Sequence, residues 1–161
     1  MKGVLVFEAG GVRLGVSIAD VARLVVEGPV APVPFGHAAL AGIMRVAGSD
    51  VGGDDATVPV FDLHGLSPGA TRPPTQRAGA TVAVIPTARG PVGLRLERLL
   101  GTANDYAAVD DAAVHDVVAT LPTALRKTLA GAGRPNDASV AVGDAVFFFF
   151  SPEAFIASVG L

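Results

Sequence analysis

The sequence predicts an all-β protein with short helices, built as two small half-open β-barrels. Each half of the chain contains a hairpin in which apolar residues alternate at period two, over residues 4–16 and 81–96. Half of the 161 residues are hydrophobic and 17% are charged, which allows a packed interior under a charge-poor surface. A proline-rich stretch without apolar periodicity, residues 67–79, predicts a mobile linker. We expect a single domain with subdomains over about 1–66 and 80–150.

The first half is expected to pass from its hairpin into a short helix and then into strands. A glycine pair after the first strand suits a tight turn. Ser17 has the position of an N-cap, and the apolar spacing after it predicts a helix that ends at Gly28-Pro29. Strands are expected over 42–47 and 57–61, joined by a polar, glycine-rich loop.

The second half is expected to continue from its hairpin into a loop and a helix. Residues 101–113 are acidic and rich in small side chains, which predicts a solvated loop. Three leucines spaced four residues apart, beginning at Leu121, predict a helix that Gly131 ends.

The C-terminal part is expected to form a hairpin over 139–150 and a final helix. Four consecutive phenylalanines, Phe147–Phe150, indicate a strand covered on both faces, because a strand with one wet face would alternate. Ser151 as N-cap and Pro152 at the first helical position predict a C-terminal helix over 151–161 that covers this strand.

Composition excludes several classes of function. A net charge of −3 argues against binding to nucleic acid and to anionic membrane surfaces. The absence of cysteine excludes disulfides and thiolate chemistry. No apolar stretch reaches the ~18 residues of a membrane span, and the N-terminal apolar run is too short for a signal peptide. We therefore expect a cytoplasmic protein with no direct membrane insertion.

No set of residues suggests catalysis, so we expect no enzymatic activity, no cofactor and no metal. His115 lies among aspartates, which we interpret as part of the solvated loop. Asp62 lies two residues before His64 and is interpreted as a cap at a strand end, since no nucleophile accompanies the pair. Arg45 and Arg95 are single arginines in apolar strands, which favours either an interface or a solvent-facing position.

The order of these pieces resembles the CheW-like domain of bacterial chemotaxis adaptors. The segments that carry the resemblance are Val4–Phe7, Arg13–Val21, Pro32–Pro34, Gly42–Met44, Val58–Leu63, Val92–Leu99 and Phe150–Phe155. The resemblance implies two five-stranded barrels packed on a shared core, with a C-terminal helix. It also implies an adaptor without activity that links chemoreceptor tips to the regulatory domain of a CheA-type histidine kinase. The kinase would bind the outer end of a barrel, and the receptor tip would bind the groove between barrels.

The chain departs from the family pattern near its receptor motif. The family usually has Asn-Leu-Arg-Gly after the Gly-Ile pair, so Ala47 stands in place of the usual Arg and Arg45 in place of the Asn. An extra loop over 49–56 carries aspartates that could pair with Arg45. We therefore expect weak or absent receptor binding. The candidate protein-binding residues are Val30, Val33, Pro34, Ile43, Arg45, Ala47, Arg95 and Leu99.

Other functions remain open from the sequence. The chain could be a diverged CheW-like scaffold for another signalling or polarity complex that has no receptor. It could also be a small-molecule sensor that uses the groove between barrels. An enzyme would need a buried acid or base in a pocket, which the sequence does not indicate. The partners we expect are the kinase regulatory domain and, as a further expectation, receptor tips in membrane-bound arrays.

Overall fold

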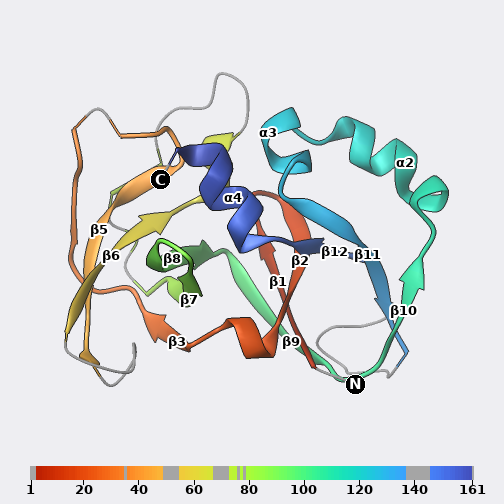
Figure 1. Cartoon of the computed structure of the whole chain (residues 1–161), viewed down its shortest axis with the longest axis horizontal. Coiled ribbons are helices and arrows are strands. Elements are labelled where there is room, and N and C mark those ends of the chain that lie inside the picture. Colours follow the sequence, from red (N-terminus) through yellow and green to blue (C-terminus); the bar gives the residue numbers. More distant parts are fainter. Residues whose placement is uncertain are drawn as a thin grey trace.

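The computed structural model of the chain consists of two six-stranded sheets that pack against each other (Figure 1). It describes residues 3–34, 36–48, 55–66, 73–75, 77, 79–136 and 146–160. Sheet A has the strand order β10-β11-β12-β2-β1-β9 and sheet B the order β3-β7-β8-β6-β5-β4. The strands of sheet A are β1 (Val4–Ala9), β2 (Val12–Ser17), β9 (Arg98–Ala103), β10 (Tyr106–Val109), β11 (Leu129–Pro135) and β12 (Phe147–Phe150). Those of sheet B are β3 (Arg23–Val26), β4 (Val30–Ala31), β5 (Leu40–Val46), β6 (Ala56–Phe61), β7 (Thr81–Thr87) and β8 (Gly90–Leu96).

Short helical segments fill the connections and the C-terminus. They are the 3-10 turns η1 (Ile18–Asp20) and η2 (Leu63–Leu66) and the helices α2 (Asp111–Thr120), α3 (Thr123–Arg126) and α4 (Pro152–Val159). Helix α4 crosses in front of the junction between the sheets, while α2 and α3 lie beside sheet A (Figure 1). No helix in the described part of the chain is long and apolar enough to cross a membrane.

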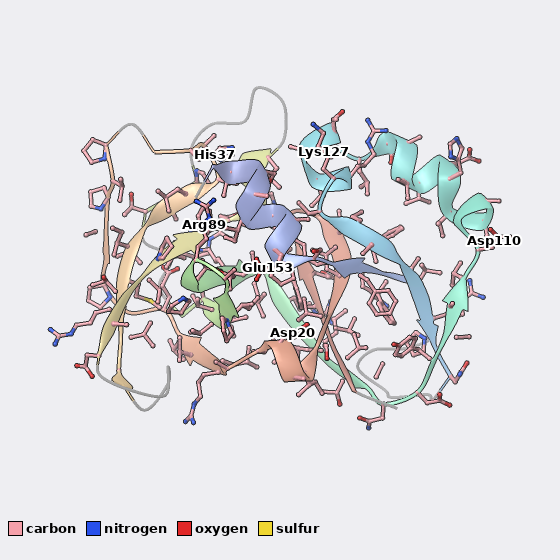
Figure 2. All side chains as sticks on the ribbon, viewed as in Figure 1. Asp20, His37, Arg89, Asp110, Lys127 and Glu153 are labelled. Atoms are coloured by element: carbon pink, nitrogen blue, oxygen red, sulfur yellow. The ribbon has the colours of Figure 1, made fainter. Side chains whose placement is uncertain are left out.

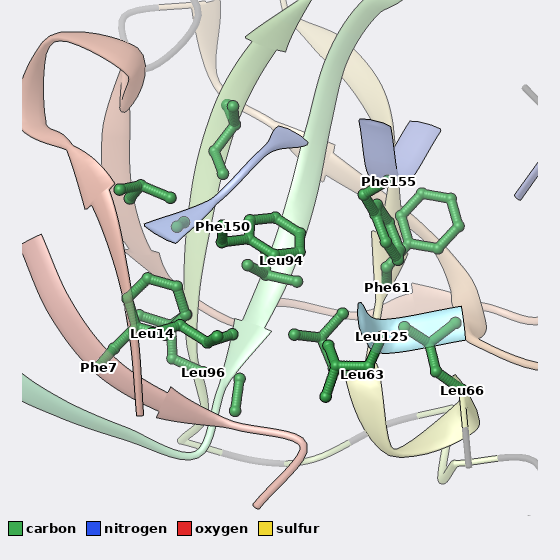
Figure 3. Close-up of a cluster of buried hydrophobic side chains, with 14 of the residues drawn as sticks. Phe7, Leu14, Phe61, Leu63, Leu66, Leu94, Leu96, Leu125, Phe150 and Phe155 are labelled. Atoms are coloured by element: carbon green, nitrogen blue, oxygen red, sulfur yellow. The ribbon is translucent and has the colours of Figure 1, made fainter. Parts of the chain in front are cut away.

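Three hydrophobic clusters explain why two sheets form. In β1, Val4 and Val6 belong to a cluster inside sheet A, whereas Leu5 and Phe7 belong to the large cluster between the sheets. Sheet B likewise has its own cluster, which includes Val82 and Val84 of β7. Figure 3 shows the shared cluster, in which side chains from both sheets and from α4 meet. The alternation of apolar residues therefore fills one interior per sheet and one core between them, and a shared core is what the sequence resemblance implied.

The strands are not divided between the sheets as predicted. The first hairpin, β1–β2, pairs with β9 and β12, and the second hairpin, β7–β8, lies between β3 and β6. Two parallel pairs, β2–β12 and β6–β8, make these long-range connections. The expectation that residues 1–66 build one barrel and 80–150 the other is therefore wrong about which strands pair. Apolar alternation fixes the face of each strand but does not choose its neighbour.

The segment predicted as a helix after Ser17 is instead a short 3-10 turn followed by a strand. Only η1 is helical, and the Ser17 side chain makes no capping hydrogen bond. The chain then extends into β3, where Arg23–Val26 pairs with β7 at the edge of sheet B. The β-branched Val25 and Val26 favour this pairing, and tertiary contacts outweigh the weak helical periodicity.

The acidic loop and the leucine helix are also corrected. Residues 101–113 contain the end of β9, all of β10 and the start of α2. Asp110 is the N-cap of α2, and its carboxylate accepts a hydrogen bond from the backbone N–H of Ala112 at 3.0 Å. Of the leucine helix only α3 forms, because Leu129 already begins β11, which pairs with β10 and β12.

The remaining predictions of elements agree with the structure. Both hairpins form, and Gly10 and Gly11 have the positive φ of the first turn (62° and 77°). The side chain of Ser151 caps α4 by accepting from Ala154 N–H at 3.2 Å. The phenylalanine strand is covered on both sides, with Phe147 in the interior of sheet A and Phe150 in the shared core. The predicted turn near residue 143 and most of the loop over 49–56 lie outside the described residues.

Candidate functional site

An inter-sheet groove runs between β9, at one edge of sheet A, and β3, at one edge of sheet B. It consists of two cavities of about 220 Å³ each. The first is lined by Leu5, Ile18, Val21, Arg23, Leu24 and Thr102. The second is lined by Arg77, Gly79–Thr81 and Leu96–Leu99. Strand β9 contributes residues to both cavities, which share no lining residue, and we refer to the two cavities together as the inter-sheet groove.

The floor of the first cavity is apolar. Leu5 belongs to the shared core, and Val21 and Leu24 pack against that core. Ile18 and Leu99 line the cavities and are each 43% exposed. An apolar surface at the margin of the core, with large side chains left in water, is typical of a site for another protein.

A second group of exposed apolar residues, besides Ile18 and Leu99 of the groove, lies at the outer face of sheet B. Ile43 is 39% exposed and lies opposite Ala31 on β4 and Pro59 on β6. Pro34 is also exposed. Among the other candidates from the sequence, Val30 is half-buried against the interior of sheet B and Val33 is half-buried against the shared core. Ile43 and Pro34 are thus the candidates on this side whose side chains a partner can reach most directly.

Arg45 and Ala47 lie at a seam between β5 and β3 and outside the inter-sheet groove. They line a cavity of about 120 Å³ together with Val26 and other residues of these strands, and neither lines a cavity of the groove. The guanidinium of Arg45 pairs with the carboxylate of Asp55 at 3.2 Å, with the arginine side chain 76% exposed. The predicted pairing of Arg45 with a loop aspartate is confirmed for Asp55.

Arg95 is not an interface residue. Its side chain is 1% exposed, and its Nε donates to Glu27 Oε1 at 2.7 Å. Its Nη1 lies 3.4 Å from Asp62 Oδ2. The remaining donors bind the carbonyls of Pro74 at 2.8 Å and Thr75 at 3.0 Å. Both interpretations of Arg95 from the sequence, as an interface residue or a solvent-facing one, are therefore wrong.

The buried arginine belongs to a polar network that sequence reasoning missed. Asp62 caps η2 as predicted, since its Oδ1 accepts from His64 N–H at 3.0 Å, but it also faces Arg95. The His64 ring contacts Asp62 at 3.0 Å and Glu97 at 3.2 Å. Glu27 comes from the connection between β3 and β4 and gave no signal in the sequence, because nothing local links it to a residue 68 positions away.

The predicted site residues therefore lie in different parts of the fold. Ile43 is exposed on the outer face of sheet B and Pro34 is exposed after β4, whereas Val30 and Val33 are half-buried against two different hydrophobic clusters. Arg45 and Ala47 lie further along β5 at the seam. Leu99 lies in the inter-sheet groove, and Arg95 lies in the interior. Within the described ranges, no three or more acidic or histidine side chains are placed to hold a metal ion.

Comparison with known proteins agrees with this arrangement. A family model described as CheW-like domain matches residues 3–148. The chain belongs to the CheW-like domain family. Its fold is similar to the crystal structure of the scaffolding protein TtCheW from Thermoanaerobacter tengcongensis, with a TM-score of 0.66 and 16% sequence identity. That match covers 96% of this chain and 87% of TtCheW. No curated protein matches the chain. At this identity the likeness to TtCheW concerns the fold, so the surfaces of this CheW-like domain must be argued from its own residues.

Proposed function

We propose that this CheW-like domain is a non-enzymatic adaptor in chemotaxis-type signalling. In this proposal it acts in the cytoplasm as one domain over residues 1–161, recruited to membrane-bound receptor arrays. It binds the regulatory domain of a CheA-type histidine kinase and, more weakly, the tips of chemoreceptors. The observation that carries the proposal is the presence of two separate exposed apolar surfaces, the inter-sheet groove and the outer face of sheet B around Ile43. An adaptor needs two such surfaces to hold two partners at once.

The kinase is assigned to the outer side of sheet B. Ile43 is exposed there beside the short edge strand β4, and Pro34 follows that strand. The family resemblance implies a kinase contact at the outer end of a barrel, which fits this location. A partner that buries Ile43 gains its apolar surface without reorganising the interior of sheet B.

Titration calorimetry with the regulatory domain of a CheA-type kinase tests this assignment. Ile43→Glu should weaken binding by about 1–3 kcal/mol if Ile43 lies in the centre of the interface. Val117→Glu is the matched control, because Val117 is an equally apolar, exposed side chain on α2, beside sheet A. Equal affinity of the Ile43 variant and the control would reject the surface. Absence of binding by the wild type would reject the kinase as partner.

The receptor tip is assigned to the inter-sheet groove. Leu99 and Ile18 offer apolar contacts in this groove. Arg45 and Ala47, which differ from the family's usual receptor motif, do not line its cavities. Those departures lie at the neighbouring seam, where Arg45 is already paired with Asp55, so we expect weak receptor binding rather than none. Leu99→Glu should remove binding of a receptor cytoplasmic fragment while kinase binding is kept. Kinase binding by a wild type that binds no receptor fragment would favour the scaffold of another signalling complex.

A further inference from the structure

The inter-sheet groove carries positive charge in a protein whose net charge is −3. Three arginines line its cavities, Arg23 in the first and Arg77 and Arg98 in the second. The acidic residue there is Glu97, which already accepts from Gly11 N–H at 2.8 Å and contacts His64. Arginines therefore outnumber acidic residues in the lining of the groove, and the first cavity has an apolar floor.

The cavity on the α4 side of the junction has the opposite character. Its volume is about 250 Å³, and its charged lining residues are Asp20 and Glu153, which Figure 2 labels on η1 and at the start of α4. The turn η1 thus contributes Ile18 to the basic groove and Asp20 to this acidic cavity. Because the two sides of the junction differ in sign, a charged segment would be steered to one of them.

The second cavity holds two arginines beside the exposed Leu99. The backbone N–H of Arg77 donates to Glu27 Oε2 at 2.6 Å, which fixes its main chain. Its guanidinium lies 3.9 Å from Asp62 Oδ2, beyond hydrogen-bond distance, and its side chain is 41% exposed. Arg98 is exposed on β9, where Glu8 lies opposite in the ladder but does not line the cavity. Beside them Leu99 is exposed, so one cavity presents guanidinium donors and an apolar side chain together.

The buried Arg95 holds this wall of the groove in position. Its two terminal nitrogens bind the carbonyls of Pro74 and Thr75, just before Arg77. The same Glu27 carboxylate binds Arg95 through one oxygen and the Arg77 backbone through the other. Most of the stretch 67–79 that was expected to be mobile lies outside the described residues, but Pro74, Thr75 and Arg77 within it are held by these hydrogen bonds.

We propose that the inter-sheet groove is matched to an acidic amphipathic helix. An aliphatic side chain of the helix packs on Leu99 and Ile18, and a carboxylate beside it pairs with Arg77 and Arg98. Arg95 is a positioning residue for Arg77. This deepens the proposed receptor site by giving the chemistry of its partner, and it rests on that proposed function only for the identity of the partner.

The test uses two synthetic helical peptides of about 18 residues, or five turns. They share one leucine stripe and differ in carrying Glu or Lys beside it. Binding to the full chain is followed by amide chemical shifts in NMR titrations. The Glu peptide should shift the amides of Ala80, Thr81 and Leu99, and its affinity should fall as NaCl rises from about 50 to 500 mM. The Lys peptide should bind more weakly and leave these amides unshifted.

Variants that remove charge identify the arginines responsible for the preference for the Glu peptide. The double variant Arg77→Gln/Arg98→Gln should bind the Glu peptide about fivefold more weakly, the effect of two exposed ion pairs. Arg134→Gln is the matched control, because Arg134 is an exposed arginine on β11 that lines neither cavity of the groove. The single variant Arg98→Gln, at an exposed position, keeps the test valid if the double variant unfolds.

The outcomes separate this proposal from the proposed function. Equal binding of the two peptides, or equal effects of the Arg98 and Arg134 variants, would overturn the charge matching even if a receptor fragment binds. Selective binding of the Glu peptide through Arg77 and Arg98 supports the charge matching. If that result accompanies no binding of a receptor fragment, only the receptor as partner is rejected.

Discussion

Replacing Arg95 by methionine should strongly destabilise the fold, because it leaves two carboxylates without their buried cation. The side chains of Glu27 and Asp62 are 0% and 4% exposed, so water cannot take the place of the guanidinium. Breaking a buried ion pair by removing one partner costs about 3–5 kcal/mol. The carbonyls of Pro74 and Thr75 lie in a less buried segment and can turn to water, so they add little. A loss of this size is a large part of the ~5–15 kcal/mol that stabilises a typical domain.

Urea unfolding followed by circular dichroism measures this loss. For a slope of about 2 kcal/mol per molar urea, Arg95→Met should lower the midpoint by roughly 2 M. Arg98→Met, at an exposed arginine on the adjacent strand, should change stability by no more than about 0.5 kcal/mol. Adding Glu27→Gln to Arg95→Met should recover part of the loss, because it removes one of the unpaired charges. Equal midpoints for the Arg95 and Arg98 variants would refute the view that Arg95 neutralises a buried acidic pair.

Three further perturbations follow from the fold. Deleting residues 151–161 removes the buried Phe155 and Ile156, each of which stabilises the folded state by about 1.5–3 kcal/mol. The truncated chain should therefore be insoluble on expression, and a soluble chain that melts cooperatively would contradict this. Gly65→Ala should destabilise by about 1–3 kcal/mol in a thermal melt, because a Cβ there would lie 2.4 Å from the rigid Ala38 carbonyl oxygen; an unchanged melting temperature would contradict the close approach. Ala47→Arg combined with Asp55→Ala should increase binding of a receptor fragment in calorimetry, since the pair that holds Arg45 is removed; unchanged affinity would place the cause of weak binding elsewhere.

The parts of the fold that local pattern determines were predictable from the sequence. Period-two alternation gave both hairpins, and the Ser-Pro start gave helix α4. The phenylalanine strand was correctly expected to be covered on both faces, since its alternate residues enter two different cores. These features depend on side chains within a few residues of one another. For the same reason, the short element β3 was misjudged, because its conformation depends on pairing with β7, far along the chain.

The candidate site was predictable only in part. Leu99 and Ile43, predicted as protein-binding residues, are exposed as such a role requires, and their binding stays a prediction. Arg95 was misplaced because an arginine flanked by apolar residues has the same pattern on a surface and in an interior. A buried arginine differs from a surface arginine in having carboxylates beside it in the fold. For Arg95 these are Glu27 and Asp62, which are distant from it and from each other in the sequence.

The same network explains how one small domain can present two docking surfaces of different character. Glu27 joins the end of β3 to β4, so it fixes the connection that leads to the outer side of sheet B. Through Arg95 and the Arg77 backbone it also fixes the charged wall of the inter-sheet groove. A rigid, buried set of charges between the two surfaces keeps each in place before a partner arrives, and preorganised surfaces lose less entropy on binding. Loosening Glu27 by Glu27→Gln should therefore weaken groove binding more than it weakens binding at Ile43, because Arg77 loses its backbone anchor while the β4–β5 pairing is kept. Equal weakening at both surfaces would show instead that Glu27 serves only overall stability.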